Sequence, residues 1–297
     1  MAMLARALPV AAARRMAGAV LTLRLLSAAV AVPFLFAVAL FGEKGTFGGY
    51  VYGGVLAIAA LLGALEGRAM LRSVGSESVD PVLFGVAIFL PLNAWFLVNR
   101  QAGRPLFGED GFLLLGVALM ASLLIPIRRQ RLENVLFDWA TSLAFGLYIG
   151  GLLQFFAPLR DRPEGGYWVI TVMGLNFICD TAAFFVGRAF GRTPLAPLIS
   201  PKKSLEGALG GVAASALVAA GWGALTGNSP LLLLGFGAAI GIAAVLGDLA
   251  ESLLKRQTGT KDSGAFLPGH GGILDRMDSL LFTVPVGVMF LQAFGSR

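Results

Sequence analysis

Charged residues, cysteine and histidine are all scarce in this sequence. Only 13% of the 297 residues are Asp, Glu, Lys or Arg, whereas a soluble domain carries about a quarter. So few charges cannot cover the surface of a globular protein in water. The single cysteine, Cys179, excludes an intrachain disulfide and a zinc site built from cysteines. The single histidine, His270, argues against zinc held by several histidines.

Apolar residues are abundant instead: they make up 57% of the chain, and the mean hydropathy is +0.79. This composition indicates that lipid is the surrounding solvent. A membrane-spanning helix needs about 20 mostly apolar residues. Nine segments come close to that length: 23–41, 48–66, 81–98, 111–127, 135–158, 167–189, 208–225, 230–253 and 279–295. We therefore predict an all-α, polytopic integral membrane helical bundle of about nine transmembrane helices.

These segments divide the chain into three parts. Residues 1–22 form an N-terminal tail, and residues 23–166 hold about five helices. Residues 167–297 form the region in which we expect the chemistry, with polar loops at 190–207 and 254–278. The tail has arginines, many alanines and no acid, which is also typical of a transit peptide or an interfacial amphipathic helix. We favour a short cytoplasmic tail.

Lysine and arginine are unevenly divided between the two sides of the predicted bundle. With the N-terminus inside, 17 of the 23 basic residues lie on the cytoplasmic side. The other six are Lys44, Arg100, Arg104, Arg160, Arg162 and Arg297. The positive-inside rule then predicts an N-in/C-out orientation with both polar loops in the cytoplasm. The basic residues lie between apolar runs, so the net charge of +6 favours anionic head groups and no nucleic acid.

Of the acidic residues that lie within predicted spans, where a charge is costly, four bear on the function. Glu66 ends the second span, Asp180 lies in the sixth, and Asp248 and Glu251 lie in the eighth. Helical residues three apart share a face, so Asp248 and Glu251 point the same way. A bound divalent cation would keep such acids ionised, and a structural pair with Lys or Arg is the alternative. All but Glu66 lie beside the two polar loops.

The first polar loop contains Ser-Pro-Lys-Lys-Ser-Leu-Glu-Gly at residues 200–207. Paired lysines and hydroxyls ahead of a helix suit a phosphate chain. The second loop, residues 252–278, combines cations, glycines and carboxylates, a combination that fits a metal–polyphosphate site. It holds neither a Walker A pattern nor a Ser-His-Asp order. For His270, which lies among glycines, we expect a hydrogen-bonding role.

The second loop also carries a long spaced pattern. It reads Ser252-x-Leu-Lys-Arg, four residues, Lys261-Asp-x-Gly, two residues, Leu267-Pro-x-His-Gly-Gly-Ile-x-Asp-Arg-Met-Asp278. This pattern resembles the complete signature of the phosphatidate cytidylyltransferase family. Two further segments are similar to that family: Asp180-x-Ala-Ala-Phe-x-x-Gly-Arg-x-x-Gly191 and the segment 200–207. Ser204 and Phe184 depart mildly, since Thr and Tyr are common there. The likeness spans nearly the whole chain and is most specific over 174–278.

The resemblance implies a helical membrane enzyme, often a homodimer, that transfers CMP from CTP to phosphatidic acid within membrane lipid and releases pyrophosphate. It also implies a centre with one or two Mg2+ ions, in which Asp248 and Asp275 match the metal-binding acids, and it allows a monovalent cation such as K+. A bacterial inner membrane, with the active site facing the cytoplasm, is the expected location.

Site roles follow for three groups of residues. We expect Asp248, Asp275 and Lys261 to be catalytic, and Asp180, Glu251 and Asp278 to hold metal or orient its ligands. The residues expected to bind substrate are Ser200, Lys202, Lys203, Ser204, Lys255, Arg256, His270 and Arg276.

Two other functions remain open at this point. One is a related CTP-dependent transferase with another lipid acceptor, such as an isoprenoid-ether lipid phosphate or a lipid alcohol. The other is an ion-coupled transporter, whose buried acids would carry ions. A transporter has no need of the loop at 252–278, which favours the enzyme.

Overall fold

The computed structural model describes residues 33–41, 47–98, 133–260, 263–264 and 271–294, together with scattered residues between 116 and 127. Seven helical segments in this part of the chain are long and apolar enough to cross a membrane. They match seven of the nine predicted spans and confirm an all-α, polytopic membrane protein. The remaining two predicted spans, 23–41 and 111–127, fall largely outside the described residues.

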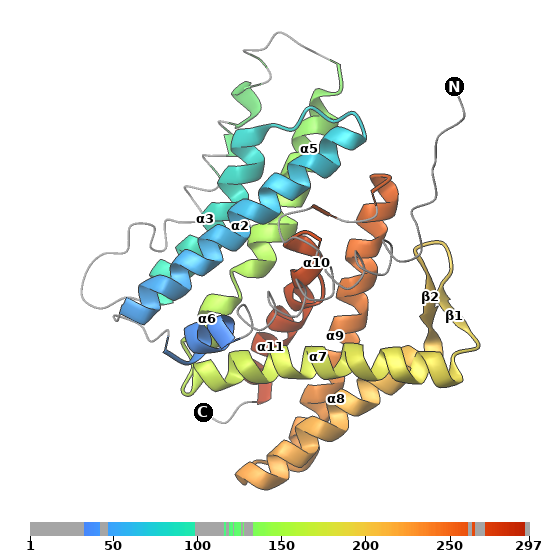
Figure 1. Cartoon of the computed structure of the whole chain (residues 1–297). Coiled ribbons are helices and arrows are strands. Elements are labelled where there is room, and N and C mark those ends of the chain that lie inside the picture. The colour runs from blue at the N-terminus through green and yellow to red at the C-terminus, as the bar shows by residue number, and fades with distance from the viewer. Residues whose placement is uncertain are drawn as a thin grey trace, which may run out of the picture.

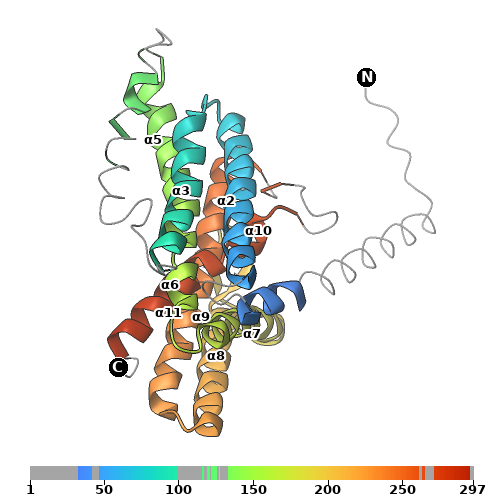
Figure 2. The same ribbon diagram turned by 90° about the vertical axis from the view of Figure 1, so that its left-hand side faces the viewer.

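The described helices follow one another along the chain. They are α2 (Phe47–Ser73), α3 (Asp80–Val98), α5 (Val135–Gly146), the π-helix η1 (Leu147–Gly151), α6 (Phe156–Arg160), α7 (Gly165–Phe190), α8 (Leu205–Thr226), α9 (Pro230–Gln257), α10 (Leu274–Met277) and α11 (Leu280–Phe294). α2, α3 and α5 run side by side in one group, as Figures 1 and 2 show. α7 and α8 pack together at the other end of the molecule, and α9 runs from them toward the first group (Figure 1).

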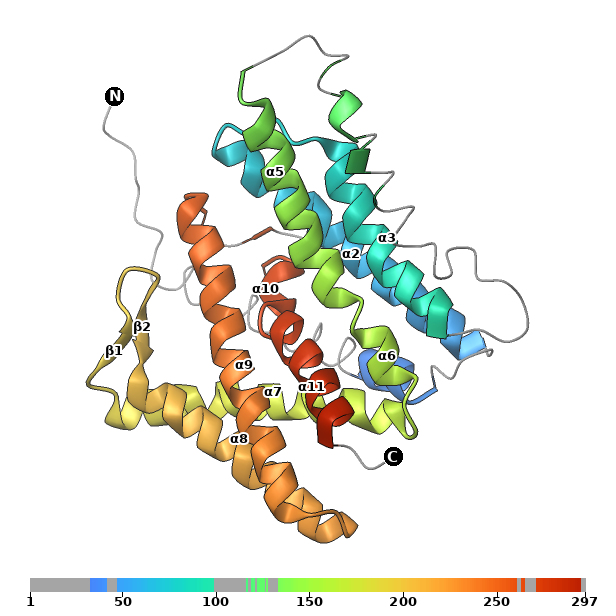
Figure 3. The same cartoon turned by 180° about the vertical axis from the view of Figure 1, so that it is seen from behind.

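One hydrophobic core joins the N-terminal and C-terminal helices. It includes Leu71 of α2, Leu83 of α3, Ile149 of η1, Phe236 of α9 and Leu281 of α11, each buried. α11 lies between α9 and the α5–α6 segment in the view from behind, and it contacts both α9 and α6 (Figure 3). The N-terminal and C-terminal helices, which are far apart in sequence, therefore pack around one core.

Small residues allow α7 and α8 to approach closely. A Cβ on Gly207 would lie 2.8 Å from the carbonyl oxygen of Ala183, and one on Gly211 would lie 2.7 Å from that of Cys179. Small residues at a helix contact are the usual means by which membrane helices pack. This packing brings the start of α8 beside the end of α7, where the first polar loop connects them.

The first polar loop, predicted at residues 190–207, contains regular structure. It forms an antiparallel hairpin of β1 (Pro194–Ala196) and β2 (Ser200–Ser204), with Ala196 paired to Ser200. Glu206 closes the base of the hairpin by accepting hydrogen bonds from the backbone N–H groups of Arg192 (3.1 Å) and Thr193 (3.1 Å). Among the described residues the fold is therefore all-α except for one short hairpin beside α9 (Figure 1).

Candidate active site at the end of helix α9

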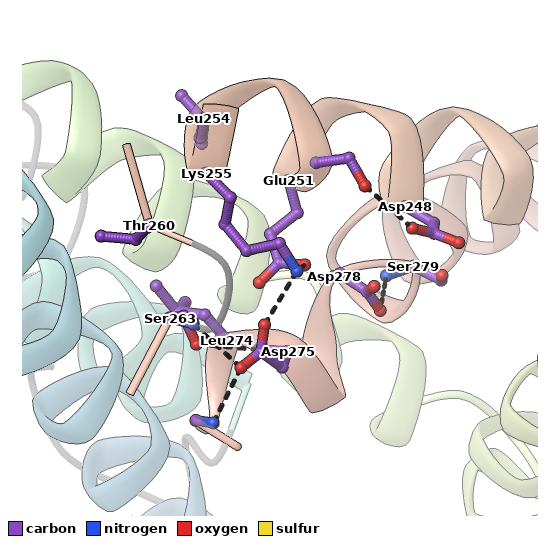
Figure 4. Close-up of polar contacts among 12 residues, drawn as sticks. Asp248, Glu251, Leu254, Lys255, Thr260, Ser263, Leu274, Asp275, Asp278 and Ser279 are labelled. Carbon is purple, nitrogen blue, oxygen red and sulfur yellow. Dashed lines mark hydrogen bonds and ion pairs between the residues drawn. The ribbon is translucent and has the colours of Figure 1, made fainter. Parts of the chain in front are cut away.

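The C-terminal half of α9 carries three functional candidates along one side. Asp248, Glu251 and Lys255 are spaced three and four residues apart, and this spacing places them on one helix face. Figure 4 shows their side chains directed toward α10 and the start of α11. The expectation that Asp248 and Glu251 share a face is therefore confirmed.

Lys255 joins two carboxylates. Its Nζ donates to Glu251 Oε2 at 2.7 Å and to Asp275 Oδ1 at 2.8 Å. The Glu251 side chain is only 1% exposed, and Lys255 is 17% exposed, so this pair is shielded from solvent. An ion pair within the protein is what a buried acid requires in order to stay ionised. The proposed contact of Lys255 with phosphate stays a prediction.

Asp275 is held by the second polar loop (residues 252–278), which carries the signature and is named the signature loop from here on. Its Oδ2 accepts hydrogen bonds from the backbone N–H groups of Ser263 (3.0 Å) and Gly272 (2.8 Å). With the bond from Lys255, this carboxylate accepts three hydrogen bonds, drawn as dashed lines in Figure 4. Asp275 therefore ties together the two described ends of the loop and the end of α9.

A second ion pair connects the first polar loop to α9. Lys203 of β2 pairs with Asp248, and the Ser252 hydroxyl donates to the same carboxylate at 3.4 Å. Side chains alternate along a strand, so the neighbouring Lys202 is exposed. Farther along α9, Arg256 Nε donates to the carbonyl oxygen of Ile199 at 3.0 Å, between the two strands. The two polar loops, which we predicted to lie on the same side of the membrane, are in direct contact.

Asp180 and Asp278 face the same region from two other elements. Asp180 of α7 accepts a hydrogen bond from Asn176 Nδ2 at 3.4 Å, and Asp278, just before α11, accepts one from the Ser279 N–H at 2.6 Å. Asp180 lies close enough to Asp278 and Asp248 for the three carboxyl groups to interact electrostatically. Helices α7 and α9 and the turn before α11 thus contribute acidic residues to one region, a composition that suits a bound cation.

The donors present suit Mg2+, although they do not form a complete cage. Within the described ranges, no three acidic, histidine or cysteine side chains converge closely enough to hold a metal ion. Mg2+ in nucleotide enzymes is bound by one or two carboxylates, with substrate phosphates and water completing the octahedron. Glu251 Oε1 is buried and has no hydrogen-bond partner among the described residues, so one carboxylate oxygen is available. The residues fit a metal shared with substrate, and the ligand assignments stay predictions.

The remaining candidates differ in how the structure uses them. The Ser204 hydroxyl accepts a hydrogen bond from the Gly207 N–H at 3.2 Å and so caps α8, which is a structural role. Ser200 begins β2, and Arg276 lies on α10 between Asp275 and Asp278. Lys261 and His270 lie outside the described residues.

Glu66 corrects the sequence-based expectation. We had placed it apart from the other acids, but its carboxylate accepts hydrogen bonds from the Ser263 hydroxyl (3.0 Å) and from the N–H groups of Ile273 (2.8 Å) and Leu274 (3.0 Å). It therefore lies against the signature loop. The signal for this residue was a buried acid in an apolar helix, but nothing local identifies partners almost 200 residues away.

Several known proteins are similar in sequence to this chain over most of their length. The model of the Cytidylyltransferase family matches residues 22–294. The phosphatidate cytidylyltransferase of Synechocystis is 31% identical over 91% of this chain and 96% of its own. The Bacillus subtilis protein of that name is 34% identical over 81% of this chain and 91% of its own, and the Brucella suis one is 41% identical over 71% and 74%.

Proposed function

Since this chain belongs to the cytidylyltransferase family, we propose that it is a CTP:phosphatidate cytidylyltransferase, which makes CDP-diacylglycerol for phospholipid synthesis. The observation that carries this proposal is that both polar loops meet at the end of α9. There Lys203 pairs with Asp248, and Lys255 pairs with Asp275. Relatives named for the same activity match most of the chain.

The reaction needs no nucleophile from the protein. A phosphate oxygen of phosphatidate is already ionised at neutral pH, and it attacks the α-phosphorus of CTP. A new P–O–P bond forms, the bond from the α-phosphorus to the bridging oxygen breaks, and that oxygen leaves with pyrophosphate. The obstacle is the repulsion between two polyanions, so the protein must supply positive charge and fixed positions.

We assign the metal to the acidic residues of the site, with Asp248 and Asp275 as the principal ligands. Mg2+ bound there would neutralise charge on the phosphates as pyrophosphate leaves. Asp180, Glu251 and Asp278 would complete or orient the ligand set. A second Mg2+ and a monovalent cation such as K+ belong to the same proposal.

Basic residues of the protein supply further positive charge to the site. The ion pairs of Lys203 and Lys255 place positive charge beside Asp248, Glu251 and Asp275 within the helical bundle. Their ammonium groups can exchange these carboxylates for phosphate oxygens when substrate binds. Arg256, Arg276, Lys202 and Lys261 would add positive charge along the same edge.

The proposed location is a bacterial inner membrane, with N-in/C-out orientation and a homodimeric assembly. This orientation puts both loops in the cytoplasm, where CTP is present, and the uneven division of Lys and Arg supports it. A reporter enzyme inserted after Gly259 reports the side of the membrane on which this loop lies. We expect the cytoplasmic side. Periplasmic activity would overturn the orientation.

The activity itself is tested with radiolabelled CTP, Mg2+ and purified protein in mixed micelles. We expect label to enter a lipid product when diacyl phosphatidate is present. Label in the product only with an isoprenoid-ether lipid phosphate or a lipid alcohol would assign a different acceptor. A transporter would leave all label in CTP, and this result would overturn the proposal.

A further inference from the structure

Glu66 belongs to α2, far from the signature loop in sequence, yet each hydrogen bond that its carboxylate accepts in the structure comes from that loop. Its side chain is 8% exposed. Oε2 accepts from the Ser263 hydroxyl and from the Leu274 N–H, both at 3.0 Å, and Oε1 accepts from the Ile273 N–H at 2.8 Å. One carboxylate therefore holds both described ends of the loop, which lie on either side of residues 265–270.

Ser263 passes this contact on to the catalytic candidates. Its hydroxyl donates to Glu66, while its backbone N–H donates to Asp275 Oδ2 at 3.0 Å. The Asp275 N–H in turn donates to the Ser263 hydroxyl oxygen at 3.3 Å. Because Asp275 also accepts from Lys255 at 2.8 Å, a continuous hydrogen-bonded chain runs from Glu66 to Lys255.

Two glycines of the signature loop permit this close approach. A Cβ on Gly264 would lie 2.6 Å from Glu66 Oε1, and one on Gly272 would collide with the Glu66 carboxylate and the Ser263 hydroxyl. Side chains at these two positions would push the loop away from α2. The glycines of the signature are therefore matched to the carboxylate of Glu66.

α2 makes a second contact with the same region. The Ser73 hydroxyl donates at 2.7 Å to the carbonyl oxygen of Thr258, the residue that follows α9. Ser73 lies two helical turns beyond Glu66, so α2 contacts both the end of α9 and the loop that follows it. A single rigid helix thus relates the residues of α9 to those of the loop.

We propose that Glu66 is a positioning residue for CMP transfer, which fixes the signature loop on α2 and thereby holds Asp275 and Lys255 in register with α9. This inference rests on the proposed function. Glu66 is not proposed to contact substrate or metal. Its effect is transmitted through Ser263 and Asp275, and it should therefore change catalysis more than global stability.

The test compares Glu66→Gln and Glu66→Asp with a matched control, Asp138→Asn. Asp138 of α5 also accepts two hydrogen bonds, from the Ser76 hydroxyl (2.9 Å) and the Glu77 N–H (3.0 Å), but it lies outside the site. The amide of Gln presents an NH2 group to three donors, so it cannot satisfy them all. Asp keeps the charge and should restore part of the function.

Two measurements are made on each variant. Hydrogen exchange at the Ile273 and Leu274 amides reports the loop contact without requiring activity. We expect it to rise at least about tenfold in Glu66→Gln and to be unchanged in the control. Steady-state kinetics should show kcat lowered by about 10- to 100-fold, as for outer residues that orient metal ligands, with the thermal midpoint displaced no more than in the control.

A double-mutant cycle with Ser263→Ala tests the route of transmission. Because Ser263 links Glu66 to Asp275, the combined variant should lose little more kcat than Glu66→Gln alone. Additive losses, unchanged amide exchange, or a kcat that falls only in step with the thermal midpoint would each overturn the positioning role. Wild-type protein without CMP transfer would overturn the proposed function instead, while the exchange experiment would still test the loop contact.

Discussion

The ammonium of Lys255 lies 2.8 Å from Oδ1 of Asp275, a residue 20 positions further along the chain. The same ammonium is 2.7 Å from Glu251 Oε2, so one cation is shared by an acid of its own helix and an acid of the loop. This arrangement couples the charge of the site to the position of the loop. Mutations of these residues should therefore change stability and catalysis, and each effect can be measured separately.

Replacement of Lys255 should destabilise the protein in a way that a second mutation relieves. Lys255→Met leaves Glu251 buried without its cation, and breaking a buried pair costs about 3–5 kcal/mol. Adding Glu251→Gln removes the uncompensated charge and should recover much of the loss. Thermal unfolding in detergent measures both steps, and neither variant should transfer CMP. No recovery in the double variant would show that Glu251 is not the residue stabilised by Lys255.

Asp275→Asn should lower turnover by about 100-fold or more. The amide loses the charge that attracts both Lys255 and a metal ion, and ligand-orienting contacts alone are worth about 10- to 100-fold. The CTP-dependent rate at saturating Mg2+ measures the effect, with Asp138→Asn as the control for a lost structural carboxylate. If Asp275→Asn kept most of its turnover, the metal assignment would be wrong.

The two lysines of β2 should behave differently although they are adjacent. Lys203→Ala removes the partner of Asp248 and should lower both thermal stability and kcat. Lys202→Ala changes an exposed side chain and should leave the thermal midpoint unchanged, with any effect confined to the KM for CTP. Equal destabilisation by both variants would contradict the alternation of side chains along β2.

Gly272→Ala should be far more harmful than a glycine substitution in an open position. The added methyl group collides with the Ser263 hydroxyl and the Glu66 carboxylate, so the loop must move. A displacement near 1 Å at a catalytic group can cost about 100-fold in kcat/KM. Gly54→Ala on α2 is the matched control, because a Cβ there meets no atom within 4 Å. A Gly272→Ala enzyme with normal kcat/KM would show that the loop adapts freely.

Removal of Mg2+ should abolish activity without unfolding the protein. Lys203 and Lys255 already pair with Asp248, Glu251 and Asp275, so we expect the bundle to form without metal. In excess chelator, CMP transfer should cease and then return on addition of Mg2+. The thermal midpoint should change by no more than about 2 °C, which corresponds to about 1 kcal/mol for a chain of this length. Unfolding in chelator would assign the metal a structural role.

The apolar runs were sufficient to predict the class of the protein and most of its described helices. Lipid allows few alternatives to a spanning helix, because every backbone hydrogen bond must be made internally. Helical spacing also predicted that Asp248 and Glu251 share a face, and the signature identified the loop at 252–278. Each of these inferences depends on residues close together in sequence.

Only the tertiary structure decided which groups are partners. Ser263 and Glu66 are 197 residues apart and meet because α2 packs against the loop, an outcome that the local sequence of neither segment encodes. The hairpin that directs Lys203, and not Lys202, toward Asp248 likewise formed within a segment that we predicted only as a polar loop. Such pairings follow from how whole helices pack. Local periodicity therefore places charged residues on faces and at helix ends, while packing determines which charge each of them meets.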